Sequence, residues 1–224
     1  MFRDRKHAAD CLAALLPHSW VRPPLVLAVP PGGVPIAASI AAELGCDFGL
    51  VLVRRLIDPR NPSLTVGSVD ISGAVHSTSR RPSANPRALS GEAWFQGRAL
   101  ERLAGIVGKR ADLEVEGRSV IVVDDGAHTG STMIGAVRRL RSQGAAHITV
   151  ALPIVPARVA QQLRALADQV VCVQEASGPV EIRAAYTSIP SLTDADICRI
   201  FSTLERRLAR ETPRPAPEHV RWDG

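Results

Sequence analysis

The sequence is poor in aromatic residues and has no long apolar run. Aromatic side chains make up 4% of the 224 residues, and the 46% that are hydrophobic are mostly Ala, Val, Leu and Ile. Such a composition is typical of buried parallel strands covered by helices. No stretch approaches the roughly 18 uninterrupted apolar residues of a membrane-spanning helix. Four of the first six residues are charged, and no apolar stretch follows them, so we expect no secretory signal and a cytoplasmic location.

Paired cysteines and interleaved aromatic residues are also lacking. The four cysteines lie far apart and include no C-x-x-C pair: Cys11, Cys46, Cys172 and Cys198. We interpret them as small buried hydrophobic side chains. The formal net charge of +5 comes from arginine, which supplies 25 of the 27 basic residues. Arginine suits phosphate groups, but dispersed arginines are also ordinary surface, and without aromatic residues for base stacking the chain is a poor candidate for nucleic-acid binding.

Apolar runs alternate with helical patterns along most of the chain. We expect strands at 25–29, 48–53, 120–123, 147–152 and 170–173, a hairpin over 64–75, and helices at 4–16, 34–44, 92–110, 132–143, 156–166 and 193–209. This alternation predicts an α/β domain with a mainly parallel central sheet flanked by helices. We assign a single domain to residues 1–211 and a Pro-rich flexible tail to 212–224. Segment 77–90 lacks apolar periodicity and predicts a mobile loop.

The most informative segment runs from Val120 to Thr132 and reads VIVVDDGAHTGST. It predicts a buried strand, a polar loop and the start of a helix, and ligands of open α/β sheets bind at the carboxyl ends of strands. Gly126 and Gly130 let the backbone approach an anion, and the helix start offers unpaired N–H groups and a partial positive charge. Further hydroxyl donors are Thr129, Ser131 and Thr132. The loop therefore predicts a phosphate site.

Two carboxylates, Asp124 and Asp125, stand beside this loop and would repel a phosphate if they pointed at it. Accepting hydrogen bonds from neighbouring sugar hydroxyls is the simplest other task, and each charge-assisted bond contributes roughly 1.5 to 3 kcal/mol. A diol beside a phosphate describes ribose 5-phosphate. The plain alternative is a strand-to-helix turn whose Asp and Thr residues only cap the helix, which explains one or two of these residues but not the whole set.

This segment resembles the 5-phosphoribose-1-pyrophosphate (PRPP) binding motif of the type I phosphoribosyltransferase family, which has four apolar positions, two aspartates, three spacers and Thr-Gly-x-Thr. The likeness extends from residue 2 to about residue 175. Four further segments resemble a little-characterised bacterial subgroup of predicted phosphoribosyltransferases: Phe2 to Arg5, Pro31 to Pro35, Val53 to Leu56, and Asn61-Pro62 with Gly67. The resemblance implies a parallel sheet flanked by helices, with a small hood built from terminal segments.

Site roles follow from the resemblance by position. It assigns the ribose 2- and 3-hydroxyls to Asp124 and Asp125. It assigns the 5-phosphate to Gly126, Ala127, His128, Thr129, Gly130, Ser131 and Thr132, and the pyrophosphate to Pro31, Gly32, Gly33, Arg54 and Arg55. The catalytic residues would be Asp124, Asp125, Arg54 and Arg55. Two plain alternatives stay open: a solvated strand end for the arginines and a tight turn for the paired glycines.

The implied reaction is transfer of ribose 5-phosphate from PRPP to a nitrogenous base or similar acceptor, with release of pyrophosphate. Such a protein is a glycosyltransferase of nucleotide metabolism. Mg²⁺ would be held mainly by PRPP, with Asp124 and Asp125 as candidate protein contacts. Catalysis would rest on positioning and electrostatics, with segment 77–90 as a candidate lid. A homodimer is compatible with the family.

Three positions depart from the subgroup pattern. Pro31 stands where the subgroup usually has arginine, Arg55 where it has lysine, and His128 where it has a small residue. Tyr186 is either an aromatic contact near the base site or a core tyrosine. Because the departures fall mostly on the pyrophosphate and acceptor sides, our alternative hypothesis is a non-catalytic regulatory protein that binds PRPP or a nucleotide on the same fold. An RNA-binding regulator ranks last.

Overall fold

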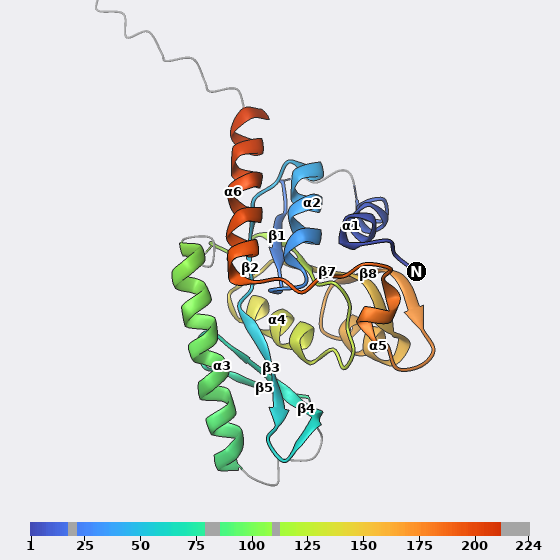
Figure 1. Cartoon of the computed structure of the whole chain (residues 1–224). Coiled ribbons are helices and arrows are strands. Elements are labelled where there is room, and N and C mark those ends of the chain that lie inside the picture. Colours follow the sequence, from blue (N-terminus) through green and yellow to red (C-terminus); the bar gives the residue numbers. More distant parts are fainter. Residues whose placement is uncertain (18–21, 79–85, 109–112, 212–224) are drawn as a thin grey trace, which may run out of the picture.

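The computed structural model describes residues 1–17, 22–78, 86–108 and 113–211 (Figure 1). Its helices are α1 (Arg5–Ala13), α2 (Val34–Leu44), α3 (Pro86–Val107), α4 (Ser131–Ser142), α5 (Ala157–Arg164), the 3-10 helix η2 (Ile182–Ala185) and α6 (Asp194–Glu211). Its strands are β1 (Leu25–Ala28), β2 (Phe48–Leu50), β3 (Val53–Asp58), β4 (Asn61–Asp70), β5 (Val75–Ser77), β6 (Ser119–Val123), β7 (His147–Pro156) and β8 (Gln169–Ala176). None of the helices in these ranges is long and apolar enough to cross a membrane.

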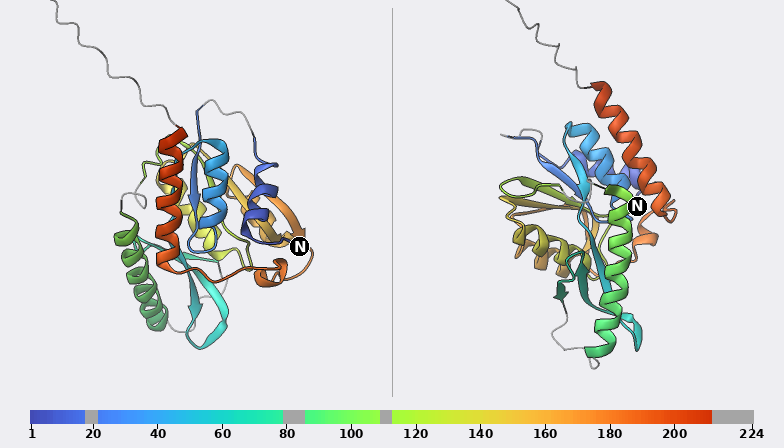
Figure 2. Two further views of the ribbon diagram at one scale, coloured as in Figure 1. Left: turned by 45° about the horizontal axis from the view of Figure 1, so that its top comes forward. Right: turned by 90° about the vertical axis from the view of Figure 1, so that its left-hand side faces the viewer.

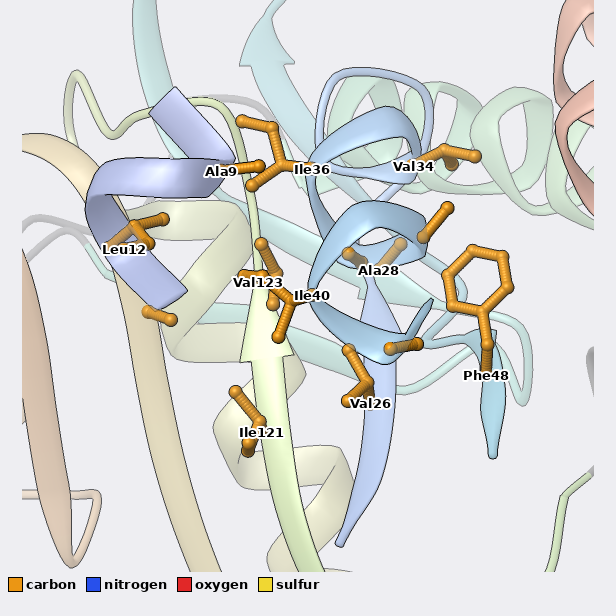
Figure 3. Close-up of a cluster of buried hydrophobic side chains, with 14 of the residues drawn as sticks. Ala9, Leu12, Val26, Ala28, Val34, Ile36, Ile40, Phe48, Ile121 and Val123 are labelled. Atoms are coloured by element: carbon orange, nitrogen blue, oxygen red, sulfur yellow. The ribbon is translucent and has the colours of Figure 1, made fainter. Parts of the chain in front are cut away.

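The main sheet has five parallel strands in the order β2-β1-β6-β7-β8. Alternate side chains of β1 and β6 pack on opposite faces. One set lies in the cluster with α1, α2 and α6 that Figure 3 shows in part: Val26, Ala28, Ile121 and Val123. The other set packs with α4 and α5: Leu25, Leu27, Val120 and Val122. Helices cover both faces, so the predicted parallel α/β fold is confirmed.

A second, antiparallel sheet of β3, β4 and β5 lies beside the main sheet (Figures 1 and 2). It lies between α3 and α4. Leu89 and Ala93 of α3 pack on the apolar cluster of the second sheet, which consists of Leu56, Val66 and Val69. Helix α4 approaches β4 closely at Gly135. The hairpin predicted over 64–75 is confirmed as the β4–β5 pair. The single strand predicted at 48–53 is wrong, because β2 ends at Leu50 and Val53 already belongs to β3 of the second sheet.

The loop predicted at 77–90 is wrong at both ends. Ser77 closes β5, and residues 86–90 belong to α3, which starts earlier than the predicted residue 92. Residues 79–85, and with them the candidate lid, lie outside the described residues, as does the predicted tail 212–224.

The N-terminal segment pairs with the segment that follows η2. Phe2 N–H donates to Ala185 O at 2.8 Å, Thr187 N–H donates to Phe2 O at 2.8 Å, and Ser188 N–H donates to Arg3 O at 2.9 Å. The rings of Phe2 and Tyr186 lie 5.3 Å apart, centroid to centroid. Tyr186 is only 5% exposed and therefore belongs to the core. This is the pairing of terminal segments that the expected hood requires.

Candidate active site

The site lies where the direction of strand order in the main sheet changes. β1 pairs with β2 on one side and with β6 on the other, and Ala28 at the end of β1 is in register with Val123 at the end of β6. The loops after β1 and β6 therefore leave the sheet side by side at its carboxyl edge. Open α/β sheets bind their ligands at such a switch point.

Paired glycines let these two loops touch. A Cβ on Gly33 would lie 2.9 Å from the Cα of Asp124, and a Cβ on Gly32 would lie 2.5 Å from Oδ1 of Asp125. Neither glycine is among those with positive φ. Close approach of backbone and carboxylate, rather than turn conformation, therefore explains the need for glycine here.

Two adjoining cavities open at this edge. The larger has a volume of about 620 Å³ and is lined by the predicted residues Pro31, Gly32, Arg54, Arg55, Asp124, Asp125 and Thr132. The smaller has a volume of about 100 Å³ and is lined by the whole loop from Gly126 to Thr132, with Arg55 and Thr65. Arg55, Asp124 and Thr132 line both. The structure thus brings together every predicted site residue except Gly33, which lies beneath the cavity against Asp124.

The loop around the smaller cavity has the form that an anion site needs. Gly126 and Gly130 have φ values of 149° and 76°, which favour glycine. No side chain caps α4 at Gly130, and Ser131 N–H makes only a long bond, 3.4 Å, to Thr129 Oγ1 within the described part of the chain. Helix capping therefore accounts for Thr129 at most, and the positive end of α4 adjoins the cavity.

Two side chains of this loop are already engaged. Ser131 is 2% exposed, and its hydroxyl lies 3.0 Å from Thr129 Oγ1 and 2.8 Å from Thr78 Oγ1. The Ser131 hydroxyl therefore stabilises the loop and is not an unengaged donor. His128 Nδ1 lies 2.5 Å from Val180 O, so Nδ1 carries a proton and donates it to that carbonyl. His128 ties the loop to the segment before η2.

The two carboxyl groups have different surroundings. Asp124 Oδ1 accepts the N–H of Asp125 at 2.8 Å. Burial, reinforced by the neighbouring Asp125 carboxylate, raises the pKa of Asp124 well above its ordinary value. Asp125 is paired with Arg5, whose Nη2 lies 2.8 Å from Oδ2, and its carbonyl accepts the hydroxyl of Tyr186 at 2.8 Å. Tyr186 thus supports the site from the core.

Arg54 and Arg55 lie in β3 and reach the cavities from the second sheet. Arg54 donates to Gln96 Oε1 on α3 at 3.2 Å, and Arg55 stands where the two cavities meet. Sequence reasoning missed four polar residues of the larger cavity: Arg5, Gln96, Arg183 and Ser191. The resemblance of Phe2 to Arg5 to the subgroup was a signal for Arg5. The sequence around Gln96 and Arg183 contains no comparable pattern.

A family model described as phosphoribosyl transferase domain matches residues 5–185. Two curated relatives from Mycobacterium tuberculosis, strains CDC 1551 / Oshkosh and H37Rv, are named "putative phosphoribosyl transferase" and are 27% identical over 213 residues, which is 93% of this chain and 48% of each relative. The chain thus spans about half the length of the curated relatives it matches. The crystal structure of TT1426 from Thermus thermophilus is 32% identical with a TM-score of 0.74, over 91% of this chain and 98% of that one. The chain belongs to the phosphoribosyl transferase domain family.

Proposed function

We propose that the chain is a magnesium-dependent phosphoribosyltransferase that moves ribose 5-phosphate from PRPP to a nitrogenous base or similar acceptor. The observation that supports this most is the pair of adjoining cavities, with a carboxyl pair between a phosphate loop at a helix start and an arginine-lined space. Membership of the family supports the same reaction class.

The two cavities divide the substrate between them. The smaller cavity, with the N-terminus of α4 at its wall, is of a size for the 5-phosphate. Asp124 and Asp125 would accept hydrogen bonds from the ribose hydroxyls. The larger cavity would take the pyrophosphate beside Arg54 and Arg55 and leave room for the acceptor.

The reaction would break the bond from the anomeric carbon to pyrophosphate oxygen and form a bond to the acceptor nitrogen. Positive charge develops on the ribose ring as the leaving group departs, and the nearby carboxylate of Asp125 would stabilise it. The arginines would stabilise the negative charge that accumulates on pyrophosphate. Positioning of the two reactants supplies the rest of the rate enhancement.

Magnesium fits this site as an ion that arrives with the substrate. In the ranges that the structure describes, no group of three or more His, Cys, Asp or Glu side chains could hold a metal ion. Mg²⁺ commonly binds through one or two carboxylates together with substrate phosphates. The phosphates of PRPP would hold most of its coordination here, with Asp124 and Asp125 as candidate protein contacts, and the bound ion would neutralise charge on the leaving pyrophosphate.

One observation favours the second candidate, a non-catalytic protein that binds PRPP or a nucleotide. Pro31 lines the larger cavity at a position where the subgroup usually has an arginine, which removes one cation from the pyrophosphate side. Such a protein would bind PRPP saturably but release no pyrophosphate with any acceptor.

Isothermal titration with PRPP, with and without Mg²⁺, tests the proposal. We expect magnesium-dependent binding that is lost in Asp124→Asn/Asp125→Asn and kept in the matched control Asp10→Asn/Asp47→Asn, whose carboxylates are exposed and outside both cavities. Failure of the intact protein to bind PRPP would refute the proposal. Pyrophosphate release with a panel of nitrogenous bases then separates the transferase from the non-catalytic protein.

A further inference from the structure

Arg5 makes the most extensive side-chain contacts in the larger cavity. It is the first residue of α1 and lies 120 positions before Asp125 in the chain. Its Nε and Nη2 donate to Oδ2 of Asp125 at 3.2 and 2.8 Å, and its Nη1 donates to Pro190 O at 2.7 Å. The side chains of Arg5 and Asp125 are only 12% and 13% exposed, so this pair is shielded from solvent.

The contacts of Arg5 use one oxygen of Asp125 and do not involve the other. Both bonds from Arg5 go to Oδ2, and neither engages Oδ1. The Asp125 carboxylate lies against Gly32, with Oδ2 nearer than Oδ1 to the place of a Cβ there, and both residues line the larger cavity. A guanidinium that holds one oxygen through two N–H groups restricts rotation of the carboxylate, which a single contact would not do.

The rest of Asp125 is held by the same assembly. Tyr186 donates its hydroxyl to Asp125 O, and the backbone of Phe2 is hydrogen-bonded to Ala185 and Thr187. Arg5 follows this paired N-terminal segment directly and binds Pro190 O further along the same wall. Residues 189–192 line the larger cavity. Arg5 therefore links the Asp125 carboxylate directly to this wall.

We propose that Arg5 is a positioning residue for sugar binding: it fixes Asp125 with Oδ1 toward a ribose hydroxyl and ties that carboxylate to the cavity wall at Pro190. The inference rests on the proposed function, since it takes the ribose of PRPP as the ligand of Asp125. It adds a residue from the N-terminus that acts through Asp125, outside the segments to which the binding roles were assigned.

Two ligands distinguish a role in sugar binding from a role in the structure of the whole site. Ribose 5-phosphate needs the sugar contact, whereas inorganic pyrophosphate needs only the cationic part of the site. We expect Arg5→Gln to weaken ribose 5-phosphate binding by about tenfold, the effect of one lost charge-assisted hydrogen bond, and to leave pyrophosphate binding with Mg²⁺ within about twofold of the unaltered protein. Arg5→Lys should recover part of the loss, because it restores the charge but not the planar fork.

The matched control is Arg3→Gln, which makes the same charge change at an exposed side chain two residues away and should alter neither affinity. A double-mutant cycle supplies the readout that a purely structural role would not give. In an Asp125→Asn background, Arg5→Gln should cause little further loss of ribose 5-phosphate affinity, because its effect passes through Asp125.

Three results would overturn the inference. Unchanged ribose 5-phosphate binding in Arg5→Gln would show that Arg5 does not position the site. Equal losses for both ligands would show that Arg5 contacts pyrophosphate or that the site has collapsed, and additive losses in the cycle would show that Arg5 acts independently of Asp125. If the unaltered protein binds neither ligand, the proposed function itself fails, which is a different result from any of these three.

Discussion

The contact between Gly32 and Asp125 makes Gly32→Ala a direct test of the site geometry. An alanine Cβ would lie 2.5 Å from Oδ1 and still closer to Oδ2, whereas ordinary van der Waals contact begins near 3.4 Å. The carboxylate must therefore move by roughly 1 Å. That movement is opposed by Arg5, whose Nη2 lies 2.8 Å from Oδ2 of the same carboxylate.

The expected cost follows from these distances. Forcing an extra methyl group into a packed site costs roughly 1 to 3 kcal/mol. Gly97 of α3 provides the matched control, because a Cβ there would meet nothing within 4 Å. At a helix-interior position with open space, Gly→Ala stabilises a protein by about 0.8 to 1 kcal/mol. The same substitution should therefore change the free energy of unfolding in opposite directions at the two positions.

Urea unfolding and titration with ribose 5-phosphate measure both consequences. We expect Gly32→Ala to lower the free energy of unfolding and to weaken ligand binding by about tenfold or more, because the displaced carboxylate loses its alignment with the sugar. Gly97→Ala should raise the free energy of unfolding and bind as the unaltered protein does. If Gly32→Ala unfolds and binds like the unaltered protein, the loops after β1 and β6 do not meet as described.

Two further predictions concern the pH dependence of stability. Burial, and then the neighbouring Asp125, raise the pKa of Asp124 in the folded state above its ordinary value. The folded state therefore binds more protons than the unfolded state, and the free energy of unfolding falls as pH rises above about 4. Asp124→Asn should therefore gain stability relative to the unaltered protein as pH rises from about 4 to about 8 in urea unfolding, and parallel profiles would contradict this. Burial opposes ionisation of Asp70, but hydrogen bonds from Ser72 and His76 outweigh it and lower the pKa. Its contribution should be lost as pH falls below about 4, so Asp70→Asn should flatten the acid limb of the stability profile, and an unchanged limb would refute that role.

The phosphate loop and the parallel sheet were predictable because their signals are local. One short segment contains both the apolar run and the phosphate loop, because the strand Val120 to Val123, the loop glycines and the start of α4 are consecutive in the chain. The predicted bounds of α2 agree with the structure because Gly33 precedes its first residue and Gly45, with φ of 63°, follows its last.

The place of β3 in the second sheet was not predictable, because the burial pattern of a strand does not identify the strand that it pairs with. Val51, Leu52 and Val53 are all buried, so the run from Phe48 to Val53 has the composition of one strand. In the structure Val51 N–H still bonds Ala28 O of the main sheet, whereas Leu52 O already accepts from Ile71 N–H. The change of partner occurs between adjacent apolar residues. By contrast, Pro86 in the first turn of α3 was a usable helix-start signal within the segment predicted as a loop.

The cation that proline at position 31 removes is offset in part by the other arginines of the larger cavity. The larger cavity is lined by four arginines, and Arg5 is committed to Asp125. Arg54, Arg55 and Arg183 are left, and none of them forms an ion pair with a carboxylate among the described residues. Three cations can still neutralise a pyrophosphate, and Arg183 enters from the segment that pairs with the N-terminus. Whether the chain is a transferase or a non-catalytic binding protein therefore depends on whether an acceptor can be aligned with the ribose. Pyrophosphate release in the presence of an acceptor measures that alignment directly.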